Sequence, residues 1–261
     1  MRRLPTLIAA TAFAILASAC TASGLNTSGP QTVDVDGVTF SYECRGEGSP
    51  VAFVEHGLAR QGMVRFDPAW DGWDTALDGM AELTTVCIYG RRGVWGTDPL
   101  ADGSFRTTSD QVDDLQSLWS TLGVVTPVVL VGHSVAGFNL RVAADRSADD
   151  VAGLVFVDAT TPGIKELNSG APPPGVAPEW LDPSASIQQT AATADVGDLP
   201  VYVITHGEGE VPDAWNTLQV ELAAISTNSQ HVTLPESSHA VHWDDPQAIV
   251  DGLAWVLQQI G

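Results

Sequence analysis

The chain has 261 residues, of which 44% are hydrophobic and 16% charged, enough apolar sequence for one substantial α/β domain and not the composition of a disordered chain. Its 32 acidic residues against 11 basic ones give a formal net charge of −21, so the chain lacks the basic surface that nucleic acid requires.

The N-terminus has the pattern of a bacterial export signal. Arg2 and Arg3 precede an apolar run from Leu7 to Ala17 that is too short to span a bilayer. The letters "ASAC" that follow resemble a lipobox, in which Cys20 is lipidated and becomes the new N-terminus. The alternative is ordinary signal-peptidase cleavage nearby, which would release the protein.

We therefore expect three parts: a signal peptide over residues 1–19, a lipidated cysteine and flexible tether over 20–30, and a folded domain over 31–261. The protein is expected to be an exported bacterial protein, either a cell-envelope lipoprotein anchored to the membrane or a secreted one. Export would allow Cys44 and Cys87 to pair, and two separate buried thiols are the alternative.

Strands and helices alternate along most of the chain. Residues 31–46 alternate apolar and polar side chains around Asp36-Gly37, which predicts a hairpin. Short apolar runs then predict strands at 49–57, 85–90, 127–132, 151–159, 199–207 and 230–234, and helical spacings fall at 73–84, 109–123, 136–145, 213–225 and 246–260. Ser109 or Asp110 is expected to cap the second helix. This order predicts an α/β fold with a mainly parallel central sheet and helices on both faces.

Residues 160–199 break this alternation and contain the stretch "APPPGVAPEWLDP". A long insertion with little strand signal is unusual in a compact domain unless it serves function, so we expect a small cap over a site. Pro172 to Pro174, Trp180 and Leu181 give the cap an apolar character that favours an acyl chain as ligand.

A serine occupies the tight corner between the strand at 127–132 and the helix at 136–145, in the sequence "GHSVAG". A serine at such a corner is held clear of the sheet, and Gly132 and Ala136 supply the small neighbours that the corner requires. The N–H of Val135 opens the following helix and is expected to stabilise an oxyanion. The turn at His56-Gly57 is expected to turn the N–H of Leu58 toward Ser134 as a second oxyanion donor. The competing interpretation of the motif is an ordinary strand-to-helix turn.

The chain resembles the α/β-hydrolase family from about Gly37 to Val256, and the stretches "VEHGLA", "GHSVAG" and "PESSHAVHWDDP" carry the resemblance. With "TTVCIYGRRGVWGTDP" and "GLVFVDATTP", they look like signatures of an exported actinobacterial branch, in which a disulfide between Cys44 and Cys87 would be plausible. The chain departs from the family in Ala136, where Gly is usual, and in Gly90, where Asp often stands.

The resemblance implies a catalytic triad. Counting back from Pro246 to the family's last motif selects His239 as the base, with Asp244 in the motif's acidic position, and leaves His231 and His242 as surface or supporting residues. Asp158, at the end of a predicted strand, is the expected acid; Glu210 is the alternative acid, and a turn cap is the alternative role for Asp158.

The expected reaction is hydrolysis of carboxylic esters through an acyl-enzyme, with Ser134 as nucleophile, His239 as base, Asp158 orienting His239, and no metal or cofactor. The same triad would also suit cofactor-free perhydrolysis, or an amidase or aminopeptidase whose substrate amine is held by Glu166, Glu179 or Asp182. A noncatalytic lipoprotein that binds an apolar ligand is the alternative outside enzymes.

Overall fold

The computed structural model describes residue 25 and residues 27–58, 72–100, 104–164, 181–207 and 213–261. The expected signal peptide and Cys20 lie outside these ranges, as does most of the expected tether. Among the helices within them, none combines the length and apolar character needed to cross a bilayer.

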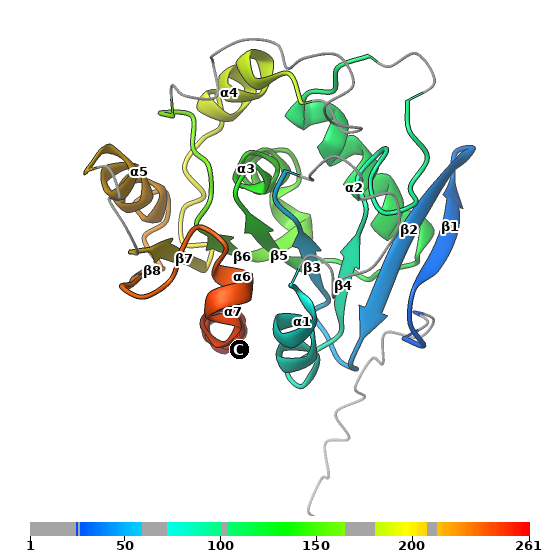
Figure 1. Cartoon of the computed structure of the whole chain (residues 1–261), viewed down its shortest axis with the longest axis horizontal. Coiled ribbons are helices and arrows are strands. Elements are labelled where there is room, and N and C mark those ends of the chain that lie inside the picture. The colour runs from blue at the N-terminus through cyan, green and yellow to red at the C-terminus, as the bar shows by residue number, and fades with distance from the viewer. Residues whose placement is uncertain (1–24, 26, 59–71, 101–103, 165–180, 208–212) are drawn as a thin grey trace, which may run out of the picture.

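A single eight-stranded sheet forms the centre of the molecule, in the order β1-β2-β4-β3-β5-β6-β7-β8 (Figure 1). Only the β1–β2 and β2–β4 pairs are antiparallel; the other pairs are parallel. The mainly parallel sheet predicted from the sequence is therefore confirmed. The strands are β1 Gln31–Val35, β2 Val38–Arg45, β3 Ala52–Glu55, β4 Val86–Tyr89, β5 Val128–His133, β6 Val151–Val157, β7 Val201–His206 and β8 Ser229–Leu234.

Helices cover both faces of the sheet (Figure 1). On one face α1 (Asp74–Ala81) and α7 (Pro246–Ile260) pack against each other, and on the other lie α2 (Thr108–Thr121), α3 (Ala136–Arg146) and α5 (Asp213–Ala223). A 3-10 turn, Ala148–Asp150, precedes β6, and the short helix α6 (Val241–Asp244) precedes α7. Each face has its own apolar core, so the central strands are buried on both sides, as their continuous apolar sequences predict.

The leading hairpin turns at the two residues that the sequence singles out. Asp36 and Gly37 have φ angles of 53° and 83°, both in the left-handed region. Two residues of positive φ match the right-handed twist of the flanking strands, and Asp-Gly adopts them at low cost. The hairpin therefore adds its antiparallel strands at the edge of the parallel sheet.

The N-cap of helix α2 lies earlier in the chain than the sequence predicts. The N-cap is Thr107, whose hydroxyl accepts from the Asp110 N–H, while the Asp110 carboxylate accepts from the Thr107 N–H at 2.7 Å. The prediction of Ser109 or Asp110 as the cap was wrong, because the side chains of Thr107 and Asp110 form a reciprocal capping box across one turn. Asp110 thus acts as the third helical residue of the box.

The expected cap region is described in part. Residues 165–180, which include Pro172 to Pro174 and Trp180, lie outside the described residues. Beyond them α4 (Pro183–Ala191) packs on α2 and α3, where Ser186 Oγ accepts from the Thr108 N–H at 3.0 Å. The described end of this region is therefore fixed to α2 and to α3, the helix that follows Ser134.

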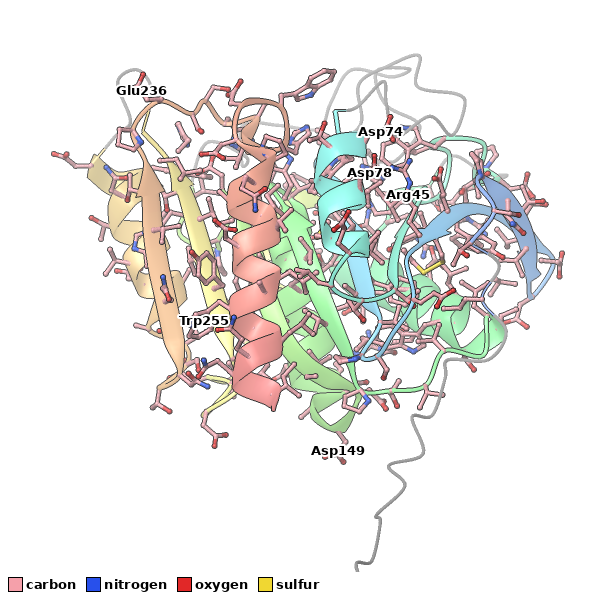
Figure 2. All side chains as sticks on the ribbon, turned by 90° about the horizontal axis from the view of Figure 1, so that it is seen from below. Arg45, Asp74, Asp78, Asp149, Glu236 and Trp255 are labelled. Carbon is pink, nitrogen blue, oxygen red and sulfur yellow. A yellow bond between two sulfur atoms is a disulfide. The ribbon has the colours of Figure 1, made fainter. Side chains whose placement is uncertain are left out.

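A disulfide joins Cys44 of β2 to Cys87 of β4, which face each other across the antiparallel pair. Figure 2 shows it as a yellow bond within the sheet, and both residues are fully buried. The bond closes a loop with a sequence separation of 43 residues, so it restricts the unfolded chain considerably. It ties the antiparallel edge of the sheet to its parallel centre.

Removing this disulfide should lower the free energy of unfolding by about 2–4 kcal/mol, because the unfolded chain regains the entropy of the open loop. Urea unfolding of the wild type and of the double variant Cys44→Ala/Cys87→Ala measures the difference. The free energy of unfolding of the wild type, measured in a reducing agent, should approach that of the double variant. Equal unfolding free energies for the oxidised wild type and the double variant would contradict this role.

Candidate active site

Ser134 lies at a strained corner between β5 and α3, with a φ angle of 55°. Its N–H donates to the Val157 carbonyl at 3.2 Å, and its own carbonyl accepts from the Thr160 N–H at 2.8 Å. A Cβ on Gly132 would lie 2.6 Å from a Leu140 methyl group, so the corner needs glycine there. A non-glycine residue held at positive φ by its surroundings is typical of a site where the chain stores strain for function.

His239 reaches this serine from the loop between β8 and α6. Its Nε2 lies 3.1 Å from Ser134 Oγ. The loop is fixed from both sides: Asp244 Oδ2 accepts from the Ser238 N–H at 2.8 Å, and His133 Nε2 donates to the His239 carbonyl at 2.8 Å. His239 is therefore held by its backbone while its side chain stays half exposed, with 49% of its side-chain surface accessible.

Asp158 is the third member of this chain of contacts, at the C-terminal end of β6. Its Oδ2 contacts His239 Nδ1 through a short hydrogen bond, and its Oδ1 accepts from Trp215 Nε1 at 2.9 Å. The carboxylate is fully buried. These partners occupy both oxygens, and both come from other elements of the fold.

Burial by itself would raise the pKa of Asp158, because a charge in an apolar setting loses its hydration. Hydrogen bonding from His239, together with the contacts of His206 and Trp215, outweighs that effect, and the pKa of Asp158 lies below its ordinary value. The carboxylate is thus charged at neutral pH and requires the Nδ1–H tautomer of His239, which leaves Nε2 free to accept a proton from Ser134.

His206 and Trp215 were not predicted as site residues from the sequence. The backbone N–H of His206 donates to Asp158 Oδ1 at 3.2 Å, and its ring Nδ1 lies 2.7 Å from Asp158 Oδ2, off the direction of a regular hydrogen bond. His206 ends β7, the strand beside the one that carries Asp158. Its position at a C-terminal strand end was the available signal, whereas Trp215 lies on a helix with no comparable signal.

Asp158, His206 and His239 are residue types that bind metals, and their ligand atoms lie within 4.8 Å of one another. However, the Asp158 Oδ2 to His206 Nδ1 distance of 2.7 Å is shorter than the roughly 3.3 Å between two ligands of a tetrahedral zinc ion. Asp158 Oδ2 and His206 Nδ1 are therefore too close to each other to be two ligands of one tetrahedral zinc ion.

The two expected oxyanion donors border the serine. Val135 follows Ser134 directly, and a Cβ on Gly57, the residue before Leu58, would lie 3.3 Å from the Ser134 Cβ. Within the described part of the chain, no backbone acceptor takes up the N–H of Leu58 or of Val135. The Gly57–Leu58 peptide therefore begins beside Ser134, and the Val135 N–H follows Ser134 directly in the chain.

No hydrogen bond from His242, His231 or His56 to Ser134 Oγ is found within the described part of the chain. His242 stacks on Trp73, with ring centroids 4.9 Å apart, and is buried; it is an inner supporting residue and not a surface one. His231 Nε2 lies 2.7 Å from Thr205 Oγ1. His56 is fully buried, and its Nδ1 donates to the Gly57 carbonyl at 2.6 Å, which places it in the turn before Leu58.

The sequence offered four other acidic residues for the site, one as the alternative acid and three as groups that could bind an amine. Glu210, Glu166 and Glu179 lie outside the described residues. Asp182 is the N-cap of α4, where its Oδ1 accepts from the Ala185 N–H at 2.9 Å, so its carboxylate already has a structural partner.

Gly90 has a structural reason to lack a side chain, because a Cβ there would lie 2.4 Å from the Val94 carbonyl oxygen.

Sequence comparison finds remote relatives. No protein-family model matches the chain. It is 32% identical over 120 residues to the "Probable transporter efuK" of Hormonema carpetanum, a match that covers 45% of this chain and 16% of that protein's length. It is 23% identical over 238 residues to the "Uncharacterized protein YqjL" of Bacillus subtilis (strain 168), covering 84% of this chain and 88% of that protein.

Solved structures define the fold. A thermophilic esterase from Thermogutta terrifontis aligns with a TM-score of 0.63 at 18% identity, over 88% of this chain and 97% of the esterase. Est1E from Butyrivibrio proteoclasticus, solved with ferulic acid, aligns with a TM-score of 0.63 at 16% identity, over 88% of this chain and 99% of Est1E. With the sheet order above, these alignments show that the chain has the α/β-hydrolase fold.

The buried imidazole of His133 should make the protein sensitive to acid. Burial, followed by the neighbouring His242 and His239, lowers the pKa of His133 from 6.5 to about 3. The unfolded chain takes up this proton near pH 6.5 while the folded chain does not, so the free energy of unfolding falls as the pH falls through this window.

Urea unfolding at pH 7 and pH 4.5 tests this effect with the variant His133→Gln, which keeps a donor but does not titrate. Between pH 7 and pH 4.5, the free energy of unfolding of the wild type should fall by about 2–3 kcal/mol more than that of the variant. An identical loss in both proteins would show that His133 does not carry this dependence. Measurements at pH 8, where both side chains are neutral, give the constant offset between them.

Proposed function

We propose that the protein is a serine hydrolase that cleaves carboxylic esters through an acyl-enzyme intermediate. The observation that carries the proposal is the continuous chain of contacts from Ser134 Oγ to His239 Nε2, at 3.1 Å, and from His239 Nδ1 to the buried Asp158 carboxylate. A serine, a histidine and a carboxylate in this order form the relay that activates a hydroxyl for acyl transfer.

In the proposed reaction, Ser134 Oγ attacks the ester carbonyl and its proton passes to His239 Nε2. The negative oxygen of the tetrahedral intermediate accepts from the N–H groups of Leu58 and Val135. His239 then gives its proton to the departing alcohol, which leaves an acyl group on Ser134. Water attacks this acyl group with His239 again as base, releasing the acid and restoring the serine. Asp158 keeps His239 in the required tautomer throughout.

An apolar acyl group suits the surroundings of the serine best. Val135 and Phe138 at the start of α3 form an apolar cluster with Leu181, and Ile187 of α4 packs against it. The cluster includes the residue whose N–H is a proposed oxyanion donor, so an acyl chain bound to Ser134 would lie near it. The solved esterase that aligns with the chain supports an ester as the substrate class.

Ester hydrolysis is favoured over the alternatives that use the same residues. An amidase or aminopeptidase would need an acidic group free to bind an amine; of the three acidic candidates Asp182 is occupied as a helix cap, and Glu166 and Glu179 lie outside the described residues. Perhydrolysis would proceed from the same acyl-enzyme with hydrogen peroxide in place of water. A pure binding protein would gain nothing from a serine held at positive φ within reach of an oriented imidazole.

We also propose that the protein is exported by the bacterial cell, with Cys20 lipidated, and belongs to an actinobacterial branch of the fold. The N-terminal sequence motifs motivate this placement. The disulfide between Cys44 and Cys87 supports it, because such bonds persist in oxidising compartments.

Hydrolysis of p-nitrophenyl esters, from acetate to long acyl chains, tests the proposed activity. The wild type should hydrolyse this series and should prefer esters whose acyl chain can pack against the apolar cluster near Ser134. The variant Ser134→Ala should lose at least about 10³-fold in kcat. Full activity in Ser134→Ala would remove the proposed mechanism.

Asp158 and Glu210 can be separated as acids by two matched amide variants. Asp158→Asn should lower kcat by about 10⁴-fold, because an amide favours the wrong tautomer of His239. Glu210→Gln should leave kcat within about twofold of the wild type, because the Asp158 carboxylate is the group that contacts His239 Nδ1. The reverse pattern would assign the acid to Glu210.

A further inference from the structure

A buried ion pair lies beneath the proposed oxyanion turn, outside the triad. Glu55 at the end of β3 and Arg91 after β4 have side-chain exposures of 0% and 3%, and Arg91 Nη1 lies 3.3 Å from Glu55 Oε2. Two charges removed from water contribute little net stability, because their desolvation offsets their attraction. The pair therefore calls for an explanation other than stability.

Arg91 holds two successive backbone carbonyls of the turn. Its Nη1 donates to the His56 carbonyl at 2.7 Å, and its Nη2 donates to the Gly57 carbonyl at 2.8 Å. A guanidinium is suited to this because its donors form a rigid planar fork. Both peptide planes of the turn are thereby fixed in orientation.

The second of these peptides is the one that carries the Leu58 N–H. In a planar trans peptide the carbonyl and the N–H point in opposite directions. With the Gly57 carbonyl bound to Arg91, the Leu58 N–H must point away from the guanidinium. On the serine's side, a Cβ at Gly57 would lie 2.6 Å from His133 Nδ1 and 3.3 Å from Ser134 Cβ, so the turn has no spare room there.

Glu55 is itself fixed by partners from two further elements. Tyr89 at the end of β4 donates its hydroxyl to Glu55 Oε1 at 2.7 Å, and Asn139 Nδ2 donates to Glu55 Oε2 at 2.8 Å. Asn139 is on α3, the helix that follows Ser134. The network therefore links the turn before Leu58 to the helix whose first turn carries the Val135 N–H.

We propose that Arg91 is a positioning residue for acyl transfer: it sets the Gly57–Leu58 peptide so that the Leu58 N–H faces the oxyanion, with Glu55 holding the guanidinium in place. The proposal rests on the proposed esterase function. In this proposal Arg91 acts on the reaction through this peptide and not as a catalytic group. Its charge near the carbonyl also polarises the peptide and strengthens the N–H as a donor.

The variant Arg91→Lys tests this role, because an ammonium keeps the charge but lacks the fork that binds both carbonyls. We expect kcat for a p-nitrophenyl ester to fall about 10- to 100-fold while KM stays within about twofold, since oxyanion contacts act in the transition state. Inhibition by an alkyl trifluoromethyl ketone, which forms a tetrahedral adduct on the serine, should weaken by a similar factor.

Arg45 provides a matched control. It also lies in an ion-pair network, with Glu43, Asp74 and Asp78, which links the end of β2 to α1 (Figure 2). Arg45→Lys should leave kcat, KM and the ketone inhibition unchanged. If Arg91→Lys does not fold, the double variant Glu55→Gln/Arg91→Met removes both charges together and should show the same loss in kcat.

The outcomes separate this inference from the function on which it rests. A folded Arg91→Lys, or a folded double variant, with kcat and ketone inhibition within twofold of the wild type would overturn the role of Arg91 while leaving the esterase intact. A loss seen equally in Arg45→Lys would also overturn it. A wild type without hydrolysis that depends on Ser134 would overturn the proposed function, and the role of Arg91 with it.

Discussion

A buried carboxylate sets the arrangement of the site. Asp158 is fully enclosed at the end of β6, and its pKa stays below the ordinary value, so it is a charge that its surroundings must satisfy. It receives the His239 ring, the Trp215 indole N–H and the backbone N–H of His206. These partners come from the loop after β8, from α5 and from β7. One charge therefore draws three separate elements together beside Ser134.

The sheet makes this convergence possible. In a parallel sheet the C-terminal ends of neighbouring strands lie along one edge, and β3, β5, β6 and β7 bring the turn at Gly57, Ser134, Asp158 and His206 to that edge. A second buried charge repeats the principle two strands away in the sheet, where Glu55 and Arg91 connect the turn at Gly57 to α3. Both networks fix groups that a reaction at Ser134 would need to be rigid.

The sequence predicts the features that depend on local patterns. The hairpin at Asp36-Gly37, the buried strands and the sharp corner at Ser134 each follow from residues adjacent in the chain. The Thr107 cap was missed although its signal was local, because Thr107 and Asp110 are spaced for a reciprocal box. The choice of His239 and Asp158 relied on the resemblance to a family, since 81 positions separate the two residues.

The buried networks were not predictable in the same way. Arg91 and Glu55 are 36 positions apart, and Trp215 and Asp158 are 57 positions apart. No periodicity links such pairs, because the fold alone brings them together. His206 occupied a strand end where a site residue is expected, but the sequence gives no sign that it would face Asp158. The cap, where specificity is expected to lie, has little pattern of its own to interpret.

The central claim is that Ser134 is an activated nucleophile, and covalent labelling tests it most directly. A fluorophosphonate reacts quickly only with a serine whose hydroxyl is activated by a base. Intact mass spectrometry of the purified protein, followed by peptide mapping, should find one phosphonyl group per chain on Ser134, and His239→Ala should prevent its rapid attachment. An unlabelled wild type, or a label on another residue, would contradict the account.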